Sequence, residues 1–150
     1  MGTMGDAAEV VLRDVVEEDV AVFFEHQQDA DAAAMAAFPS RSREDHDAHW
    51  RGLLGDETVV KKAIVVEGQV TGNIGSWIDE GHRKVGYWIG KPFWGRGVAT
   101  AALRVLLTTI EDRPLYAWVA QHNAGSIRAL EKAGFVYDRD DADHRVYRVP

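Results

Sequence analysis

The chain has 150 residues, 46% of them hydrophobic, which is enough for one domain over residues 1–150 with a substantial buried core. Its formal net charge of -7 argues against general nucleic-acid binding, which requires a broad basic surface, and suits a cationic acceptor better. The absence of cysteine excludes disulfides, thiolate metal sites and a cysteine nucleophile, and the six histidines show no spacing that predicts a metal site. No apolar stretch is long enough to span a membrane and no export signal is visible, so we expect a cytoplasmic protein.

The first third of the chain predicts a strand followed by helices. A short apolar run at 10–12 precedes the acidic segment 14–17, which is typical of the start of a helix, and apolar residues continue at helical spacing beyond it. The alanine-rich segment 28–43 is ambiguous, because Pro39 should break any helix there. A further helix is predicted over about 43–54.

The middle of the chain changes to the period of β-strands. β-Branched runs at 58–66 and 69–78 enclose a Glu-Gly pair that indicates a hairpin. A third strand over 82–89 follows a second Glu-Gly turn, so the three runs predict an antiparallel meander.

The last third predicts alternating strands and helices. A helix follows the glycine turn, with one buried face formed by apolar residues from Ala99 to Ile110, and it leads to a strand over 115–119, so this unit implies a right-handed crossover with parallel ends. A short helix over 123–133 and a closing hairpin of 135–138 and 145–149 complete the order β-α-α-β-β-β-α-β-α-β-β. The sequence therefore predicts an α/β fold with a mixed, mostly antiparallel sheet of six to seven strands and flanking helices.

The turn between the strand at 82–89 and the following helix is the most informative segment. Gly95 and Gly97 remove side chains where a phosphate would approach the main chain, and the unpaired N–H groups of a helix start attract anions. Segment 83–110 has five basic residues and no acidic one. We interpret the turn as a candidate pyrophosphate site; a plain loop with a solvated basic face is the alternative. It lacks the lysine of a nucleotide triphosphate loop and the third glycine of a dinucleotide fingerprint.

Two blocks of the sequence resemble the signature blocks of the GCN5-related N-acetyltransferases, most closely the branch that includes the ribosomal-protein N-terminal acetyltransferases. The first block contains Tyr87-Trp88-Ile89-Gly90 and Trp94-Gly95-Arg96-Gly97-Val98-Ala99-Thr100, and the second runs from Asn123 to Phe135. The blocks have the expected order and separation, and their direct similarity covers about residues 85–135, whereas the first third of the chain matches only in outline. The resemblance implies a single N-acetyltransferase domain in which a splayed pair of parallel strands forms the cofactor cleft.

The resemblance implies that this cleft binds acetyl-CoA as the acetyl donor and that no metal takes part. It places the pantetheine arm along the main chain of one strand, the pyrophosphate on the glycine turn, and the sulfur near the second block. The residues implied to contact acetyl-CoA are Trp88, Ile89, Gly95, Arg96, Gly97, Val98, Ala99, Thr100, Asn123 and Ser126. Asn123 is equally explained as a helix N-cap, and Ser126 as an ordinary residue of the first helical turn.

The implied chemistry is direct attack of an amine on the acetyl thioester in a ternary complex, where positioning supplies roughly 7 to 11 kcal/mol. The main-chain N–H near Ile89 is our candidate for polarising the carbonyl oxygen, and Ser126 for hydrogen-bonding the thiolate. A number of relatives carry a proton-donating tyrosine where we place Glu131. Glu25, His26 and Asp29 lie in a region that lines the acceptor site in relatives, so one of them is predicted to orient or deprotonate the amine; plain surface is the alternative.

The leading hypothesis is an acetyl-CoA-dependent N-acetyltransferase that acts on a primary amine, either a protein N-terminus or a small molecule. The alternative, supported by the missing tyrosine, is a non-catalytic acyl-CoA-binding sensor or partner-binding domain. A nucleotide-binding regulator is disfavoured by the incomplete phosphate loop. The sequence predicts no nucleic-acid or membrane partner, is compatible with a homodimer, and does not identify the acceptor.

Overall fold

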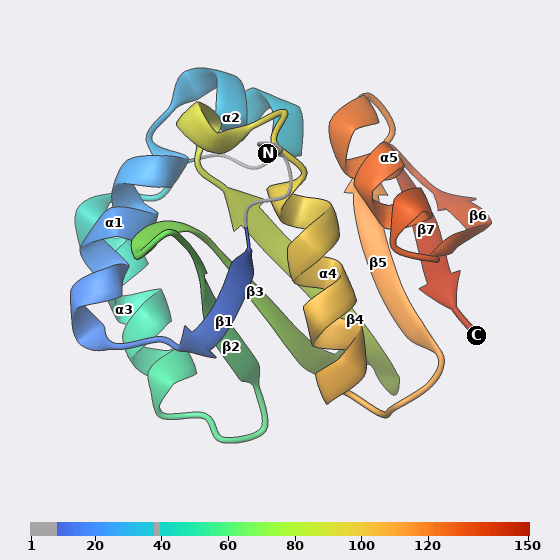
Figure 1. Ribbon diagram of the computed structural model, residues 1–150, viewed down its shortest axis with the longest axis horizontal. Helices are drawn as coiled ribbons and strands as arrows, with labels where there is room; N and C mark the ends of the chain where they lie inside the picture. The colour runs from blue at the N-terminus through green and yellow to red at the C-terminus, as the bar shows by residue number, and fades with distance from the viewer. Residues whose placement is uncertain (1–8, 38–39) are drawn as a thin grey trace.

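A seven-stranded sheet flanked by helices forms the centre of the computed structural model, which describes residues 9–37 and 40–150 (Figure 1). The strands are β1 (Val10–Asp14), β2 (Val60–Val66), β3 (Gln69–Asp79), β4 (His82–Ile89), β5 (Leu115–Ala120), β6 (Val136–Asp141) and β7 (His144–Val149). The helices are α1 (Glu17–Gln27), α2 (Ala30–Ala36), α3 (Arg43–Leu54), the 3-10 turn η2 (Lys91–Phe93), α4 (Val98–Thr109) and α5 (Ala124–Lys132). The sheet order is β1-β2-β3-β4-β5-β7-β6, which confirms the predicted fold class.

The parallel pair of strands separates soon after it forms. β4 and β5 are the parallel neighbours, and their pairing joins Arg83 to Leu115 and Lys84 to Tyr116; all other neighbouring strands are antiparallel. Figure 1 shows β4 and β5 diverging toward the end of the sheet at which α4 and α5 begin. The last part of β4, up to Ile89, therefore has one edge without a strand partner.

Different helices cover the two faces of the sheet, because successive residues of a strand point to opposite faces. Ile64 of β2 belongs to the larger core, which includes Leu103 of α4. The preceding residue, Ala63, packs with Phe23 of α1 and Trp50 of α3 in a second core. β4 thus contacts α4 on one face and α1 on the other.

The first third of the chain differs from the prediction in two places. We expected the segment at Asp14 to open the first helix, but Asp14 ends β1 opposite Lys62, and α1 begins at Glu17. Helix α2 was not expected. Its N-cap is Asp29, whose carboxylate accepts a hydrogen bond from the Ala32 N–H at 3.0 Å, and this cap, together with the high helix propensity of alanine, accounts for so short a helix. The predicted break at Pro39 lies outside the described residues.

The start of α1 is held by a buried carboxylate. Asp19 is 4% exposed and accepts hydrogen bonds from two nitrogens of Arg13, at 2.7 and 2.9 Å, and from the Val16 N–H at 2.9 Å. The Arg13 guanidinium is the main reason that the pKa of Asp19 lies below its usual value, and burial opposes it.

We expect Asp19→Asn to lower the free energy of unfolding by about 2 kcal/mol at pH 7, because hydrogen bonds to charged groups contribute about 1.5–3 kcal/mol. The pKa of Asp19 is lower in the folded than in the unfolded chain, so this stabilisation is present above the unfolded value of about 3.9 and is lost as the pH falls through the folded value. Urea midpoints of the wild type and the variant should therefore converge below about pH 4. Asp14→Asn is the matched control, since its 87% exposed carboxylate pairs with Lys62 at the surface. A difference in urea midpoint between the wild type and Asp19→Asn that does not change with pH would contradict a stabilising role of the ionised Asp19 carboxylate.

Candidate active site

The turn between β4 and α4 has the backbone geometry of an anion site. Gly95 and Gly97 have φ angles of 78° and 75°, which favour glycine, and Gly97 is the N-cap of α4. The first N–H groups of α4 have no partner within the helix and carry its partial positive charge. The Trp94 indole N–H donates to the Ile89 carbonyl at 2.9 Å and holds the turn against the end of β4. These features fit a pyrophosphate group.

A cavity of about 640 Å³, which we call the main cavity, is bounded by this turn, the end of β4 and the start of α5. Its volume is in the range of small-molecule sites. Nine of the ten predicted cofactor residues line it: Trp88, Ile89, Gly95, Gly97, Val98, Ala99, Thr100, Asn123 and Ser126. The tenth, Arg96, is not among the lining residues, and its guanidinium lies 5.8 Å from the centre of the Phe93 ring.

The basic character of segment 83–110 is largely neutralised in the fold. Arg83, Lys84 and Lys91 pair with Asp112, Asp79 and Asp31, respectively. Positive charge reaches the main cavity from α5 instead, through Arg128 and Lys132 in its wall. These two residues were not among the predicted site residues, although their i, i+4 spacing on a predicted helix indicated a shared face.

Tyr87 is a third residue that sequence reasoning missed. It lines the main cavity together with Ser126, and its hydroxyl is buried next to the Ser126 side chain. Burial raises the pKa of the Tyr87 phenol, and the neighbouring Ser126 side chain opposes this more weakly. The phenol is therefore protonated at neutral pH and has a proton to donate. Tyr87 lies two residues before Ile89 on the same face of β4, and this spacing could have placed it at the site from the sequence.

The second block of the predicted motif forms the wall of the main cavity on the side of α5. The Asn123 Oδ1 accepts a hydrogen bond from the Ser126 N–H at 3.2 Å, so Asn123 is an N-cap. The cap uses the amide oxygen and leaves the amide nitrogen for a ligand, so both interpretations of Asn123 are compatible with the structure. Glu131, where we placed the tyrosine of relatives, is not among the residues lining the cavity, and its carboxylate accepts a long hydrogen bond of 3.4 Å from the Tyr147 hydroxyl.

Helix α2 closes one side of the main cavity, to which it contributes three small or flexible apolar side chains: Ala32, Met35 and Ala36. Two contacts hold it there. Asp31 pairs with Lys91, which follows β4, and the His122 Nε2 contacts the Ala34 carbonyl at 2.9 Å, next to the start of α5. The helix therefore bridges both sides of the opening between β4 and β5.

Two of the residues predicted at the acceptor site occupy different positions. His26 packs on Gly90 at the end of β4, where a Cβ atom would lie 2.7 Å from the His26 Cδ2. Its Nδ1 is buried without a hydrogen bond to a described residue, and burial lowers the pKa of the imidazole. Asp29 caps α2. Neither side chain lines the main cavity, so the acceptor roles of His26 and Asp29 stay predictions.

A smaller cavity of about 130 Å³, which we call the side cavity, lies on the face of the sheet covered by α1 and α3. Trp88 lines both cavities, so they share a wall at the end of β4. The other residues of the side cavity are Phe23, Gln27, Arg41, His46, His49, Trp50 and Asn73.

Comparison with known proteins settles the family. Residues 9–136 match the family described as "Acetyltransferase (GNAT) domain". The chain belongs to this family. Two solved structures with a similar fold, both of AAC(6')-Ib, contain acetyl-CoA and coenzyme A, respectively. Within the described part of the chain, no group of three or more His, Cys, Asp or Glu side chains could hold a metal ion. None of the described helices has the length and apolar character needed to cross a membrane.

The GNAT domain also resembles individual proteins. It is 32% identical over 94 residues to "Putative ribosomal N-acetyltransferase YdaF" of Bacillus subtilis (strain 168), a match that covers 58% of this chain and 51% of that relative. The chain thus spans about half the length of this curated relative. Its fold matches that of an acetyltransferase from Thermus thermophilus with a TM-score of 0.81 at 19% identity, over 98% of this chain and 99% of that one. It matches AAC(6')-Ib in complex with parmomycin and acetyl-CoA with a TM-score of 0.77 at 20% identity, over 93% and 92% of the chains.

Proposed function

We propose that this GNAT domain transfers the acetyl group of acetyl-CoA to a primary amine, which attacks the thioester directly in a ternary complex. The observation that carries the proposal is the composition of the main cavity. One continuous wall joins the glycine turn, the free edge of β4, and the side chains of Tyr87 and Ser126. The protein thereby has an anion site and a proton donor along one cleft.

Polarisation of the acetyl carbonyl is assigned to β4. The Gly90 N–H donates to the Thr71 carbonyl of β3 at 2.9 Å. Main-chain groups of successive strand residues point in opposite directions, so the N–H of Ile89 points away from β3, toward the opening between β4 and β5. Acetyl-CoA supplies an activated thioester, and the Ile89 N–H would stabilise negative charge on its carbonyl oxygen.

Proton transfer is assigned to side chains around the end of β4. When the carbon–sulfur bond breaks, the Tyr87 hydroxyl would donate its proton to the sulfur, and Ser126 would hydrogen-bond the same atom. His26 would accept the proton of the attacking amine, because its lowered pKa keeps it neutral at pH 7. Deprotonating an α-amine at neutral pH costs only about 1 kcal/mol, against roughly 4–5 kcal/mol for a lysine amine, so an α-amine requires less help from such a base.

The proposal is tested by incubating the protein with acetyl-CoA and a library of amines, while free coenzyme A and acetylated products are measured. The names of similar proteins supply two sets of acceptors: peptides with the N-terminal sequences of ribosomal proteins, and aminoglycosides. We expect coenzyme A release that depends on the acceptor, with an equal amount of N-acetylated product. Binding of acetyl-CoA with no product from any acceptor would favour the non-catalytic sensor instead.

A further inference from the structure

The side cavity contains buried polar groups that the proposed transfer does not use. Gln27 is 6% exposed, and its amide nitrogen makes no hydrogen bond to a described residue. His46 is 1% exposed and lies across the cavity on α3. Buried donors without a partner are rare in folded proteins and call for a ligand or water, and a cavity of this size has room for a small polar group. A ligand with oxygen acceptors would satisfy them.

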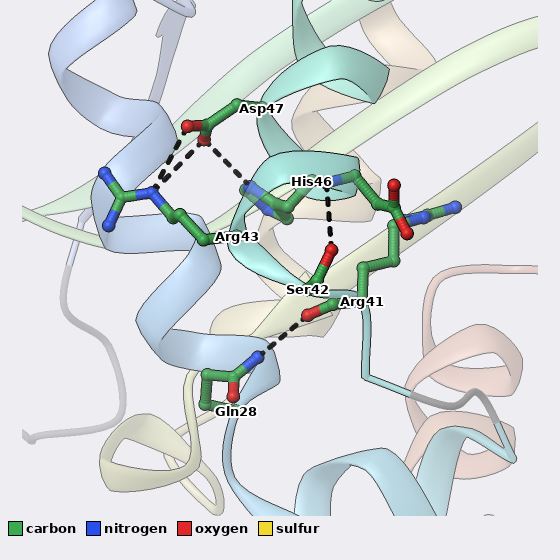
Figure 2. A network of polar contacts seen from close by, with 7 residues as sticks. Gln28, Arg41, Ser42, Arg43, His46 and Asp47 are labelled. Atoms are coloured by element: carbon green, nitrogen blue, oxygen red, sulfur yellow. Dashed lines mark hydrogen bonds and ion pairs between the residues drawn. The ribbon is translucent and has the colours of Figure 1, made fainter.

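Arg41 is placed at the side cavity by hydrogen bonds on both sides of it in the sequence. The Ser40 hydroxyl donates to the Gln27 carbonyl at 2.8 Å. The Gln28 amide donates to the Arg41 carbonyl at 3.2 Å (Figure 2). The Ser42 hydroxyl then accepts from the Asp45 N–H at 3.1 Å and caps α3. These contacts hold the main chain on both sides of Arg41, whose side chain lines the side cavity.

The described lining of the side cavity contains one charged side chain, Arg41, and no acidic side chain. The nearby Asp47 is turned toward Arg43 and His46, with its carboxylate 3.3 Å from the Arg43 Nε (Figure 2). Burial lowers the pKa of His46 and His49, and the charge of Arg41 lowers both further, so the two rings are neutral at pH 7.

From these observations we infer that the side cavity binds a carboxylate carried by the amine acceptor. Arg41 pairs with the carboxylate, and the Gln27 amide donates a hydrogen bond to it, which is the donor set that best fits a planar oxyanion. The inference rests on the proposed acetyl transfer and names its acceptor class. A polycationic amine is disfavoured, because it would bring ammonium groups next to Arg41.

The position of the side cavity agrees with this role. Trp88 belongs to both cavities, and its cross-strand neighbour Asn73 lies in the wall of the side cavity. The carboxylate would thus lie on one side of β4, while the amine reaches the donor at the end of the same strand. An acceptor with amine and carboxylate separated by a short chain matches this arrangement, whether it is a free amino acid or a peptide with an acidic residue near its N-terminus.

The test uses pairs of acceptors that differ only in the carboxylate. One pair is 4-aminobutyrate and 4-aminobutanamide, and the other is the C-terminally amidated peptides Ala-Glu-Ala-Ala and Ala-Gln-Ala-Ala. We expect kcat/KM for the carboxylate member of at least one pair to be roughly 10- to 100-fold higher, mainly through KM, as for a charge-assisted hydrogen bond. Arg41→Gln should remove this preference. Arg43→Gln is the matched control, because it deletes the same charge from a residue that is 59% exposed and does not line the side cavity.

The outcomes separate this inference from the proposed function. Equal acetylation of both members of each pair, or equal effects of Arg41→Gln and Arg43→Gln, would overturn the inference and leave acetyl transfer intact. The pair with the larger preference identifies the source of the carboxylate as a small molecule or a peptide. If no acceptor is acetylated, the proposed function fails, and calorimetry of the same four compounds with the coenzyme A-bound protein decides the inference. Binding of a carboxylate member that Arg41→Gln abolishes would support it, and absence of such binding would overturn it.

Discussion

Gly97→Asp should reduce the affinity for acetyl-CoA by about 100-fold or more, measured by isothermal titration calorimetry. The variant places a carboxylate on the N-cap of α4, where the proposed pyrophosphate accepts hydrogen bonds from main-chain N–H groups. Two like charges about 4 Å apart at a protein surface repel by about 4 kcal/mol, and every 1.4 kcal/mol is a tenfold change in affinity. Gly97 also has a φ angle of 75°, so the new side chain adds backbone strain.

Two control variants separate the charge from the strain. Asparagine is nearly the same size as aspartate and tolerates a positive φ angle about as well, but it carries no charge. Gly97→Asn should therefore retain most of the affinity for acetyl-CoA. Gly68→Asp introduces the same aspartate at a φ angle of 79° in the turn between β2 and β3, where a Cβ atom would meet nothing within 4 Å. Its affinity for acetyl-CoA should equal that of the wild type. An unchanged affinity for Gly97→Asp would show that the pyrophosphate binds elsewhere.

The parts of the site that could be predicted from the sequence are those encoded by local backbone geometry. A turn with two positive φ angles favours glycine, and a helix that starts at such a turn requires an N-cap and an apolar face. Gly95, Gly97 and Asn123 therefore predicted the turn and the start of α5 directly. The splayed strand pair followed from the resemblance, not from the residues of β4 and β5 themselves.

The remaining parts depend on contacts between distant segments. The basic residues of segment 83–110 suggested an anion site, but Lys91 is paired with Asp31 and Arg83 with Asp112, partners that no local pattern reveals. Arg41 and Asn73 are distant in the sequence and both line the side cavity, and this proximity could be predicted only if the packing of α1 and α3 were known. Tyr87 was quoted in the motif, yet its role depends on burial beside Ser126, which is a property of the fold.

Tyr87→Phe should lower kcat about 100-fold or more with little change in acetyl-CoA affinity, because a positioned proton donor contributes typically 10²–10⁴-fold. The change removes a single hydroxyl and keeps the aromatic ring, so folding should be preserved. Tyr116→Phe is the matched control, since Tyr116 on β5 does not line the main cavity.

Comparison of Tyr87→Phe with Ser126→Ala identifies the group that protonates the sulfur. If Tyr87 is the donor, its loss should abolish the fall in kcat at high pH that accompanies ionisation of the phenol, whose raised pKa places this fall above about pH 10. Ser126→Ala should then cost less, because a serine hydroxyl would only support the thiolate through a hydrogen bond. The opposite order, with kcat retained by Tyr87→Phe and lost in Ser126→Ala, would return the proton-donor role to Ser126. In that case the Tyr87 hydroxyl would contribute to substrate binding, and Tyr87→Phe should raise KM instead.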